Sequence, residues 1–570
     1  MEKFKKEKDD LLKYYTQTKQ RIDLNIDMNS QKIIAQTKLT FLFKNEKDNL
    51  ISDIPDFLYL HLNGENIIIN NIKIIKCDFE KMKKKKDEKS ISFNEYKNMK
   101  DLEFKYSSPI CNYKNYLDNL FQNIEELESY KNIKRIEWEI RQKGNIIIKF
   151  PKKLLIEQNN QKNIKKNSNE NLVNVNNNNN ENLLIKKIKI VINHILIEKN
   201  IGIIFQQFNE HQKDKSYIIC YTPNFYFNTQ NWVPCIYNLI LQITWSLYLY
   251  IPDGYMSYSS CLLNQIIKDE SGKKLIIYKN IEKTTARNIG FIIIKEKYYT
   301  ININQNFIIV SHKDKKENIE NNLIKNKLIE TLYDFHFNFF DINSNIKNTS
   351  TSIIFIPYIL FDNPNQGFNK FIKLKEDTYF SFIKFPNLYI LPEKYIYNEN
   401  IPEISKFQLK MLSKLFISNY IGGLIIEKSY ADFWIINGLE SYLSNLFLTK
   451  LYNDDYIKIK IYKWLLKFKK ECKKGKETLP LYTNNYSNPV ELQLNPIFNL
   501  KCKIFFHLLE SKIGKDNIKN IINNIIHQRE KEGCNISTQI LIDKCETLCG
   551  IKLNNYFELF VYKTGMMEIN

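Results

Sequence analysis

Alternating apolar and polar positions run through the first half of the chain. Residues 21–46 (RIDLNIDMNSQKIIAQTKLTFLFKNE) hold two such runs around a turn, and the pattern returns in 144–151, 184–198, 200–207 and 244–252. Side chains of a strand point alternately to the two faces of a sheet, so this period predicts strands with one buried face. Isoleucine dominates the runs, and its branched side chain suits a half-buried pleated surface.

After about residue 315 the apolar residues take helical spacing. The segments with this spacing are 321–340, 403–427, 431–449, 453–470, 498–511 and 514–529. Residues 351–361 and 379–391 are strand-like exceptions. A β-rich half followed by a mostly helical half predicts two domains, which we place at residues 1–312 and 313–570.

Two segments lack the pattern of a packed element. Residues 157–182 are rich in asparagine and lysine and cannot bury enough apolar surface to fold, so we expect a disordered insertion in a surface loop. Residues 81–90 (KMKKKKDEKS) form a basic run that we expect to be a solvated loop.

Charge changes the picture more than composition does. Hydrophobic residues make up 43% of the 570, enough for packed cores. Lysine and arginine number 83 against 63 acidic residues, so the formal net charge is +20. A positive field of this size favours anionic partners such as nucleic acid or acidic proteins. A general lysine bias explains the same charge equally well, so both interpretations stay open.

Histidine and cysteine give no metal motif. The chain has seven histidines, none four residues from another, and ten cysteines without a Cys-x-x-Cys pair. Two histidines one turn apart on a helix, or paired cysteines, are the usual basis of a zinc site.

An aromatic-Pro-Cys segment marks a family resemblance. Residues 232–235 are Trp-Val-Pro-Cys, so Trp232, Pro234 and Cys235 precede a strand that carries Thr244 and Trp245. This order resembles the aminopeptidase N family of gluzincins and, in its Trp-x-Pro-Cys and Thr-Trp pairs, the non-enzymatic family of TFIID subunit 2. The peptidases' Asp-Glu-Pro after the cysteine is replaced by Ile-Tyr-Asn at 236–238.

A second stretch, residues 404–443, resembles the zinc helix of those peptidases and the segment after it. Gly422 takes the place of the glycine that follows the zinc helix. Trp434 takes the place of the tryptophan before the third zinc ligand, and Gly438 and Tyr442 match the glycine and tyrosine after it. The resemblance covers most of the chain, and the order and spacing of its segments carry it.

The resemblance implies that four catalytic positions are degenerate. The two histidine ligands fall on Lys414 and Ser418, the general base on Leu415, and the third ligand on Asn437. A protonated amine has no lone pair for zinc, and an aliphatic side chain cannot accept a proton. The Gly-x-Met-Glu-Asn segment is missing from 384–390, and the oxyanion tyrosine falls near Asn499, with Tyr482 and Tyr486 upstream.

The resemblance therefore implies a catalytically inactive scaffold. The expected fold is a β-rich, saddle-like N-terminal domain followed by a mostly helical, thermolysin-like α+β domain, with Trp232, Pro234 and Cys235 buried at their interface. The expected function is a non-catalytic nuclear subunit of TFIID that supports core-promoter DNA engagement and assembly of RNA polymerase II initiation complexes. The expected partners are other TBP-associated factors and promoter DNA, with no membrane, small-molecule substrate, cofactor or metal.

Two other functions stay open. One is a diverged zinc aminopeptidase with an unusual site, and the other is an aminopeptidase-fold scaffold that binds only proteins. In the family a β-sandwich and a helical-repeat domain follow the peptidase-like domain, and no sequence for them lies in these 570 residues. We expect an apolar surface beside the last helix.

Overall fold

The structure is a computed structural model. It describes residues 15–43, 57–62, 67–76, 99–106, 146–149, 156–157, 183–184, 187–197, 202–209, 216–224, 229–236, 241–269, 272–280, 282–296, 298–304, 307–320, 335, 350–357, 383–396, 402–451, 454–473, 479–483, 495–532 and 535–564. The basic run at 81–90 and all but the first residue of the insertion at 157–182 lie outside these ranges, so both stay predictions.

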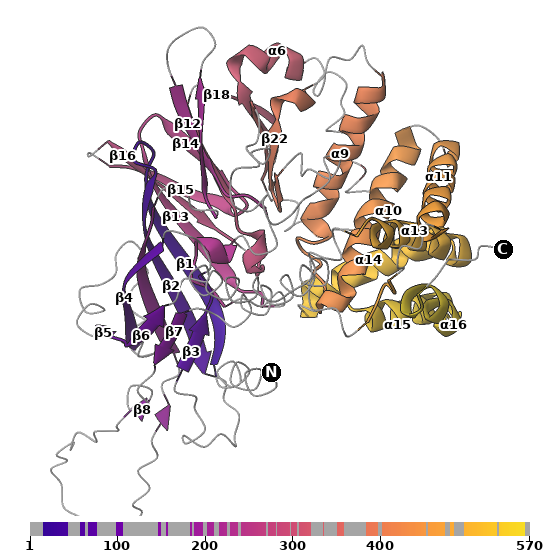
Figure 1. Cartoon of the computed structure of the whole chain (residues 1–570), viewed down its shortest axis with the longest axis horizontal. Helices are drawn as coiled ribbons and strands as arrows, with labels where there is room; N and C mark the ends of the chain where they lie inside the picture. Colours follow the sequence, from indigo (N-terminus) through magenta and orange to yellow (C-terminus); the bar gives the residue numbers. More distant parts are fainter. Residues whose placement is uncertain are drawn as a thin grey trace, which may run out of the picture.

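An eight-stranded sheet dominates the N-terminal region (Figure 1). Its order is β15 (Leu262–Lys268), β16 (Lys273–Lys279), β13 (Thr244–Pro252), β1 (Tyr15–Asp27), β2 (Lys32–Phe43), β10 (Lys187–Leu196), β4 (Ile67–Lys76) and β5 (Met99–Asp101). The two runs predicted in 21–46 are the antiparallel pair β1 and β2. Along β1 buried and partly exposed residues alternate for most of its length, as the hydrophobic pattern predicts.

Three smaller sheets complete the N-terminal region. One consists of β11 (Ile204–Asn209), β12 (Ser216–Tyr221), β17 (Phe291–Lys295) and β14 (Tyr255–Ser259). The others are β3 (Phe57–Leu60), β7 (Ile146–Lys149) and β6 (Phe104–Tyr106), and the pair β8 (Ile156–Glu157) and β9 (Leu183–Leu184). Two short 3-10 helices, η3 (Thr229–Asn231) and η4 (Ala286–Asn288), lie in the connections.

A five-stranded sheet spans the predicted domain boundary. Its order is β18 (Tyr298–Asn304), β19 (Phe307–His312), β20 (Thr351–Ile356), β22 (Leu388–Pro392) and β21 (Ile383–Phe385). Strand β19 pairs with β20 in parallel, so the sheet takes strands from both sides of residue 312. Along the chain, η5 (Lys313–Lys315) and α6 (Lys316–Ile319) follow β19 and precede β20.

The C-terminal region is helical and lies to one side of the sheets, in orange and yellow in Figure 1. Its elements are η9 (Glu393–Tyr395), α9 (Pro402–Tyr420), η10 (Tyr430–Asp432), α10 (Phe433–Leu451), α11 (Asp454–Lys473), α13 (Pro496–Ile513), α14 (Lys515–Glu532), α15 (Thr538–Cys549), α16 (Asn554–Phe557) and the π-helix η11 (Glu558–Tyr562). Among the described helices none is long and apolar enough to cross a membrane.

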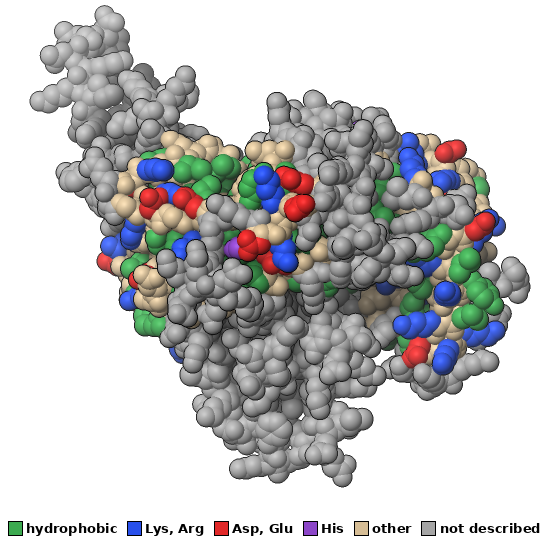
Figure 2. All heavy atoms as spheres, turned by 90° about the horizontal axis from the view of Figure 1, so that it is seen from above, with side chains coloured by type: hydrophobic (Ala, Val, Ile, Leu, Met, Phe, Trp, Pro, Cys, Tyr) green, Lys and Arg blue, Asp and Glu red, His purple; other side chains and the backbone are tan. Residues whose placement is uncertain are grey.

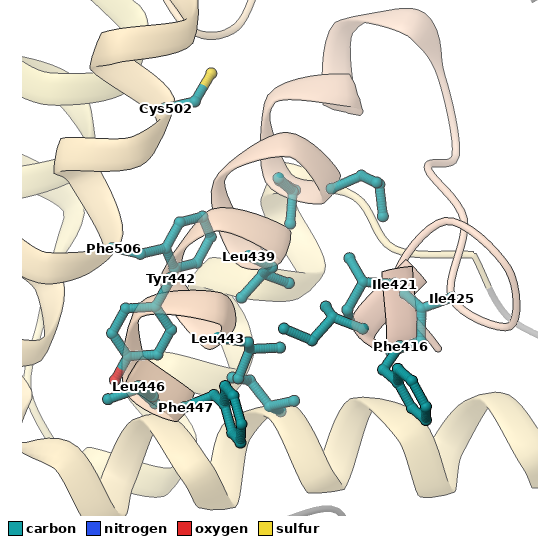
Figure 3. Close-up of a cluster of buried hydrophobic side chains, with 14 of the residues drawn as sticks. Phe416, Ile421, Ile425, Leu439, Tyr442, Leu443, Leu446, Phe447, Cys502 and Phe506 are labelled. Atoms are coloured by element: carbon teal, nitrogen blue, oxygen red, sulfur yellow. The ribbon is translucent and has the colours of Figure 1, made fainter. Parts of the chain in front are cut away.

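Helix α10 is the centre of this helical region. Figure 3 shows Tyr442 of α10 beside Phe506 of α13, with Leu439 and Leu443 turned toward Ile421. The same face carries Trp434, whose ring packs edge-to-face on Phe505 and is stacked at 5.8 Å on Phe506. Burying aromatic rings of this size supplies much of the hydrophobic free energy that holds helices together.

Polar contacts join the helical region to the sheets. Arg287 of η4 forms a bidentate ion pair with Glu427 in the loop after α9, with Nη2 and Oε2 2.7 Å apart. The Gln242 side chain donates to Asn535 at 2.6 Å, and Asn288 donates to the carbonyls of residues 422 and 423. The loop after α9 and the residues before α15 are thus held against the N-terminal region.

Exposed apolar side chains lie at the C-terminal end of the described chain. Leu548, Ile551 and Leu559 are all exposed, in and after α15 and in η11. An apolar surface was expected here, beside the last helix.

Candidate functional site

Helices α9 and α10 pack side by side and carry the four residues that the sequence resemblance aligns with the peptidases' zinc ligands and base. Ser413 of α9 and Ser444 of α10 share a buried hydrogen bond of 2.6 Å, which fixes the two helices together. Leu415 is fully buried, and its backbone carbonyl accepts hydrogen bonds of 2.6 Å from Tyr389 and from the Ser418 hydroxyl. The Ser418 side chain therefore turns back onto its own helix.

Asn437 connects α10 to α13. Its side-chain amide donates to Oδ1 of Asn499, the residue near which the oxyanion tyrosine was expected. The two residues that the resemblance aligns with the third ligand and, approximately, with the oxyanion tyrosine are thus joined by an amide–amide hydrogen bond. Neither side chain carries a charge.

Lys414 is half-buried near an ion pair between Lys384 of β21 and Glu440 of α10, whose Nζ and Oε1 are 2.6 Å apart. Burial lowers the pKa of Lys414 because the charged form loses water; Glu440 opposes the shift and Lys384 adds to it. The position of the first zinc ligand therefore holds an amine among charged groups.

These side chains do not fit a zinc ion. The four positions offer an amine, an aliphatic group, a hydroxyl and an amide, whereas zinc in proteins takes imidazole, thiolate and carboxylate. Glu440, the carboxylate near them, is engaged by Lys384. Within the part of the chain that the structure describes, no three histidine, cysteine or acidic side chains gather to hold a metal.

The Trp-Val-Pro-Cys segment is buried, but its position differs from the prediction. Trp232 and Cys235 belong to the core of the N-terminal region, where Trp232 packs edge-to-face on Phe291 at 5.6 Å. The carbonyl of Pro234 accepts a hydrogen bond from Gln20 of β1. The segment was expected at the interface between the two regions; its described contacts are with the core of the N-terminal region and with β1.

The segment reaches the interface only indirectly. Thr229 of η3 donates a hydrogen bond of 2.6 Å to the carbonyl of Ala286 in η4, and the next residue, Arg287, makes the ion pair with Glu427. The sequence pattern could show that the segment is buried, but it could not show which of two adjoining cores holds it.

A buried histidine on β10 supports the segment and gives a pH-dependent prediction. Ring Nε2 of His194 lies 3.2 Å from the carbonyl of Trp232. Complete burial lowers the pKa of His194 from 6.5 to about 4. Below pH 6.5 the unfolded chain binds a proton that the folded chain does not, so stability falls as the pH falls toward 4.

We expect the free energy of unfolding to fall by about 2 kcal/mol between about pH 7 and pH 5 through His194 alone. Urea unfolding of the wild-type chain and of His194→Gln at both pH values measures this contribution, because the glutamine variant lacks it. Parallel pH dependences in the two proteins would show that His194 is not the group responsible.

The remaining motif residues are structural. Trp245 of β13 is buried and donates to the carbonyl of Thr284, and Trp434 donates to Thr538 at 3.1 Å. Gly422 has a φ of +93°, which L-residues with side chains rarely adopt. A Cβ on Gly438 would lie 2.5 Å from the Phe506 ring, so only glycine lets α10 and α13 approach this closely.

Tyr442 is also a structural residue. Its buried side chain lies between α10 and α13, with its ring centre 5.1 Å from that of His507. Burial, and then the nearby Glu510, raises the pKa of Tyr442. The tyrosine is therefore neutral and packs as part of the core.

Sequence reasoning missed the charged residues around Lys414. Lys384 and Glu440 are separated along the chain and belong to a strand and a helix, and neither stands in a motif. A lysine-rich sequence hides the few lysines that turn inward, so the signal could come only from the fold.

Comparisons with known proteins give one related sequence and the fold. No model of a known protein family matches the chain. Transcription initiation factor TFIID subunit 2 of Schizosaccharomyces pombe is 26% identical over 211 residues, which are 35% of this chain and 17% of that protein. The chain thus covers only a small part of that relative's length.

Solved structures of yeast LTA4 hydrolase, one bound to bestatin and one native, superpose with TM-scores of 0.63 and 0.62. They are 10% and 11% identical, and each match covers 98% of this chain and 69% of the other. This likeness shows a gluzincin aminopeptidase fold with a β-rich N-terminal and a helical C-terminal region. The saddle-like shape stays a prediction.

Proposed function

We propose that this chain is a non-catalytic subunit of the general transcription factor TFIID, acting in the nucleus. The similarity to TFIID subunit 2 of fission yeast carries the proposal. The side chains at the zinc position support it, because Lys414, Leu415, Ser418 and Asn437 offer neither a ligand set nor a general base. Its partners are then other TBP-associated factors and core-promoter DNA.

The purified chain is expected to hold no stoichiometric zinc and to cleave no amino-acid anilides. Elemental analysis and an assay with and without chelator measure both. Stoichiometric zinc, or cleavage that a chelator abolishes, would favour a diverged aminopeptidase instead.

The same site offers a gain-of-function control. The variant Lys414→His/Ser418→His/Asn437→Glu restores two histidines one turn apart on α9 and a carboxylate on α10. Because two histidines one turn apart and a carboxylate are a usual ligand set for zinc, we expect this variant to bind one zinc ion per chain. A folded variant that takes up no zinc would show that α9 and α10 have lost the spacing of the ligand positions.

Exposed lysines of α11 are candidates for contact with DNA. Figure 2 shows lysine and arginine side chains interspersed with apolar ones over the helical part of the molecule, at the right of the view. The exposed lysines of α11 are Lys458, Lys463, Lys467, Lys469 and Lys470. Ammonium groups bind DNA phosphates and release counterions, so binding weakens steeply with salt.

We expect duplex promoter DNA to bind with an affinity that falls about 10³- to 10⁵-fold between about 50 and 200 mM salt, if six to ten phosphates are neutralised. The variant Lys463→Gln/Lys467→Gln/Lys470→Gln should weaken binding and lower the salt slope by about 2 to 3. Fluorescence anisotropy measures both. Binding that does not depend on salt, or no binding, would favour a scaffold that contacts only proteins.

Copurification separates the TFIID proposal from its rivals. The tagged chain, purified from nuclear extract, is expected to bring TBP-associated factors with it. A preparation that contains none of them would contradict the proposal whatever the DNA assay shows.

A further inference from the structure

Five lysines from four elements at the helical region lie close enough to interact electrostatically with one another, and three of the five also act on one carboxylate. We call them the lysine cluster: Lys384 of β21, Lys410 and Lys414 of α9, Lys460 of α11 and Lys503 of α13. The carboxylate is Glu440 of α10, and all six side chains are half-buried. Charged side chains that leave bulk water are normally paired, so their partners decide what the cluster does.

The partners within the described chain leave most of this charge uncompensated. Glu440 forms an ion pair with Lys384, and the ammonium of Lys460 donates a hydrogen bond of 2.6 Å to Oδ1 of Asn445. Of the described residues, none forms a hydrogen bond or ion pair with the ammonium of Lys410, Lys414 or Lys503. Protonated in full, the cluster holds five positive charges against one negative.

The cations also act on one another. Burial, followed by the charges of Lys410, Lys414 and Lys503, lowers the pKa of Lys460 to about 7. Burial and then Lys414 and Lys410 lower the pKa of Lys503 to about 8. Burial alone would raise the pKa of Glu440, but Lys384 and Lys414 outweigh it and lower that pKa. Among the described residues, the cluster therefore has more positive than negative charge.

Other groups that face the cluster do not balance this charge. Asn445 of α10 contacts His507 of α13 at 3.0 Å, and His507 lies 3.8 Å from Glu510. The ammonium of Lys460 lies over two aromatic rings of α11. Its nitrogen is 5.8 Å from the ring centre of Tyr456 and 5.3 Å from that of Trp464. Glu510 is thus placed next to the histidine, and the aromatic rings carry no net charge.

We propose that the lysine cluster binds an acidic peptide segment, whose aspartate or glutamate side chains enter between α9, α10, α11, α13 and β21. Carboxylates form short, charge-assisted hydrogen bonds with ammonium groups. The ammonium groups are distributed over several elements, so single charges spaced along an extended peptide match them better than one compact phosphate does. The inference goes beyond the proposed role in TFIID and does not depend on it.

Duplex DNA fits the cluster less well. Phosphates on a duplex are reached by exposed side chains such as those of α11, whereas the cluster's ammonium groups are half-buried. An acidic side chain on an extended peptide can approach half-buried ammonium groups and neutralise them. The two ligands should thus use different lysines.

The test uses the whole chain and a fluorescent decaglutamate peptide. We expect Lys414→Gln/Lys503→Gln to weaken peptide binding at least about tenfold at neutral pH, because two charge-assisted contacts are lost. The matched control Lys458→Gln/Lys463→Gln removes the same charge from the exposed face of α11 and should change affinity less than about twofold. Equal weakening in both variants would show non-specific attraction and overturn the proposal.

Two further variants control for the lost charge, for folding and for the lysines that contact DNA. Lys414→Arg/Lys503→Arg keeps the charges and should retain binding, while thermal melting confirms that each variant is folded. The α11 triple variant that weakens DNA binding should leave peptide binding unchanged. If the glutamine variant of the cluster weakens DNA binding but not peptide binding, or if inorganic phosphate binds and the peptide does not, the acidic-peptide assignment is wrong.

The pH dependence gives an independent readout. Only protonated lysines attract carboxylates, and Lys460 and Lys503 lose their protons near neutral pH. Peptide affinity should therefore fall between about pH 6 and pH 9. Affinity that stays constant over this range would contradict a role for these two lysines.

Discussion

Replacing Arg287 with alanine is expected to lower the free energy of unfolding by about 3–5 kcal/mol. The side chain of Glu427 is 1% exposed and that of Arg287 is 11% exposed. Removing the guanidinium leaves a buried carboxylate without its ion-pair partner, and the cost of its desolvation is no longer offset. Urea unfolding of the whole chain at neutral pH measures the loss.

A double variant is the control for this prediction. Arg287→Met/Glu427→Leu removes both charges and replaces them with apolar groups of similar size, which is often neutral or stabilising. It should lie within about 1 kcal/mol of the wild type. A single variant that loses no more than the double variant would show that the pair contributes little and that other contacts hold the two regions together.

The second large effect is expected at Trp434. Its indole is completely buried against Phe505 and Phe506 and donates a hydrogen bond to Thr538. Trp434→Ala should lower the free energy of unfolding by about 3–5 kcal/mol, since it leaves a cavity in a close-packed core. Chemical denaturation followed by far-UV circular dichroism measures the change.

Trp464 offers a matched control because it is a tryptophan on the neighbouring α11 and is only half-buried. Trp464→Ala should lower the free energy of unfolding clearly less than Trp434→Ala does. The reason is that folding buries less of the apolar surface of Trp464. Equal losses at the two sites would mean that the core around α10 closes over the missing side chain.

Hydrophobic spacing was enough to predict which residues face the core of the helical region. The helical spacing of apolar residues in 403–427 predicts a buried stripe, and Leu412, Leu415, Phe416 and Ile421 of that segment are all buried. The strand pair in 21–46 and the strand at 351–361 are also confirmed, although β20 ends at Ile356. Burial follows directly from periodicity, because side chains at regular intervals share a face.

Backbone changes were harder to predict. A helix was expected to continue to residue 427, but α9 ends at Tyr420, and the amide of Gly422 instead donates to the carbonyl of Ile425. The apolar residues after Gly422 maintain the helical pattern while belonging to a buried loop. The sequence signal that should have outweighed that pattern is the pair of consecutive glycines at 422–423. In the structure the first of them has a positive φ, which ends the helix.

The candidate site depends on contacts that no local pattern contains. The four degenerate positions follow from motif spacing, whereas the lysine cluster requires the arrangement of β21, α9, α10, α11 and α13 in space. In a chain with 83 basic residues, the sequence pattern cannot distinguish a single inward-facing lysine from the exposed ones. Only packing distinguishes Lys414 from a solvated lysine.

The position of β1 has a consequence for how the chain is made. On one side it pairs with β2, its neighbour in sequence, but on the other it pairs in parallel with β13, residues 19–25 against 244–250. During synthesis the second edge of β1 has no partner until β13 leaves the ribosome. Unpaired strand edges recruit other strands, so nascent chains should need protection by chaperones until that point. Recombinant fragments that end just before β13 should aggregate more than fragments that extend through β17, because only the longer ones pair both edges of β1 and complete the sheet of β12 and β14.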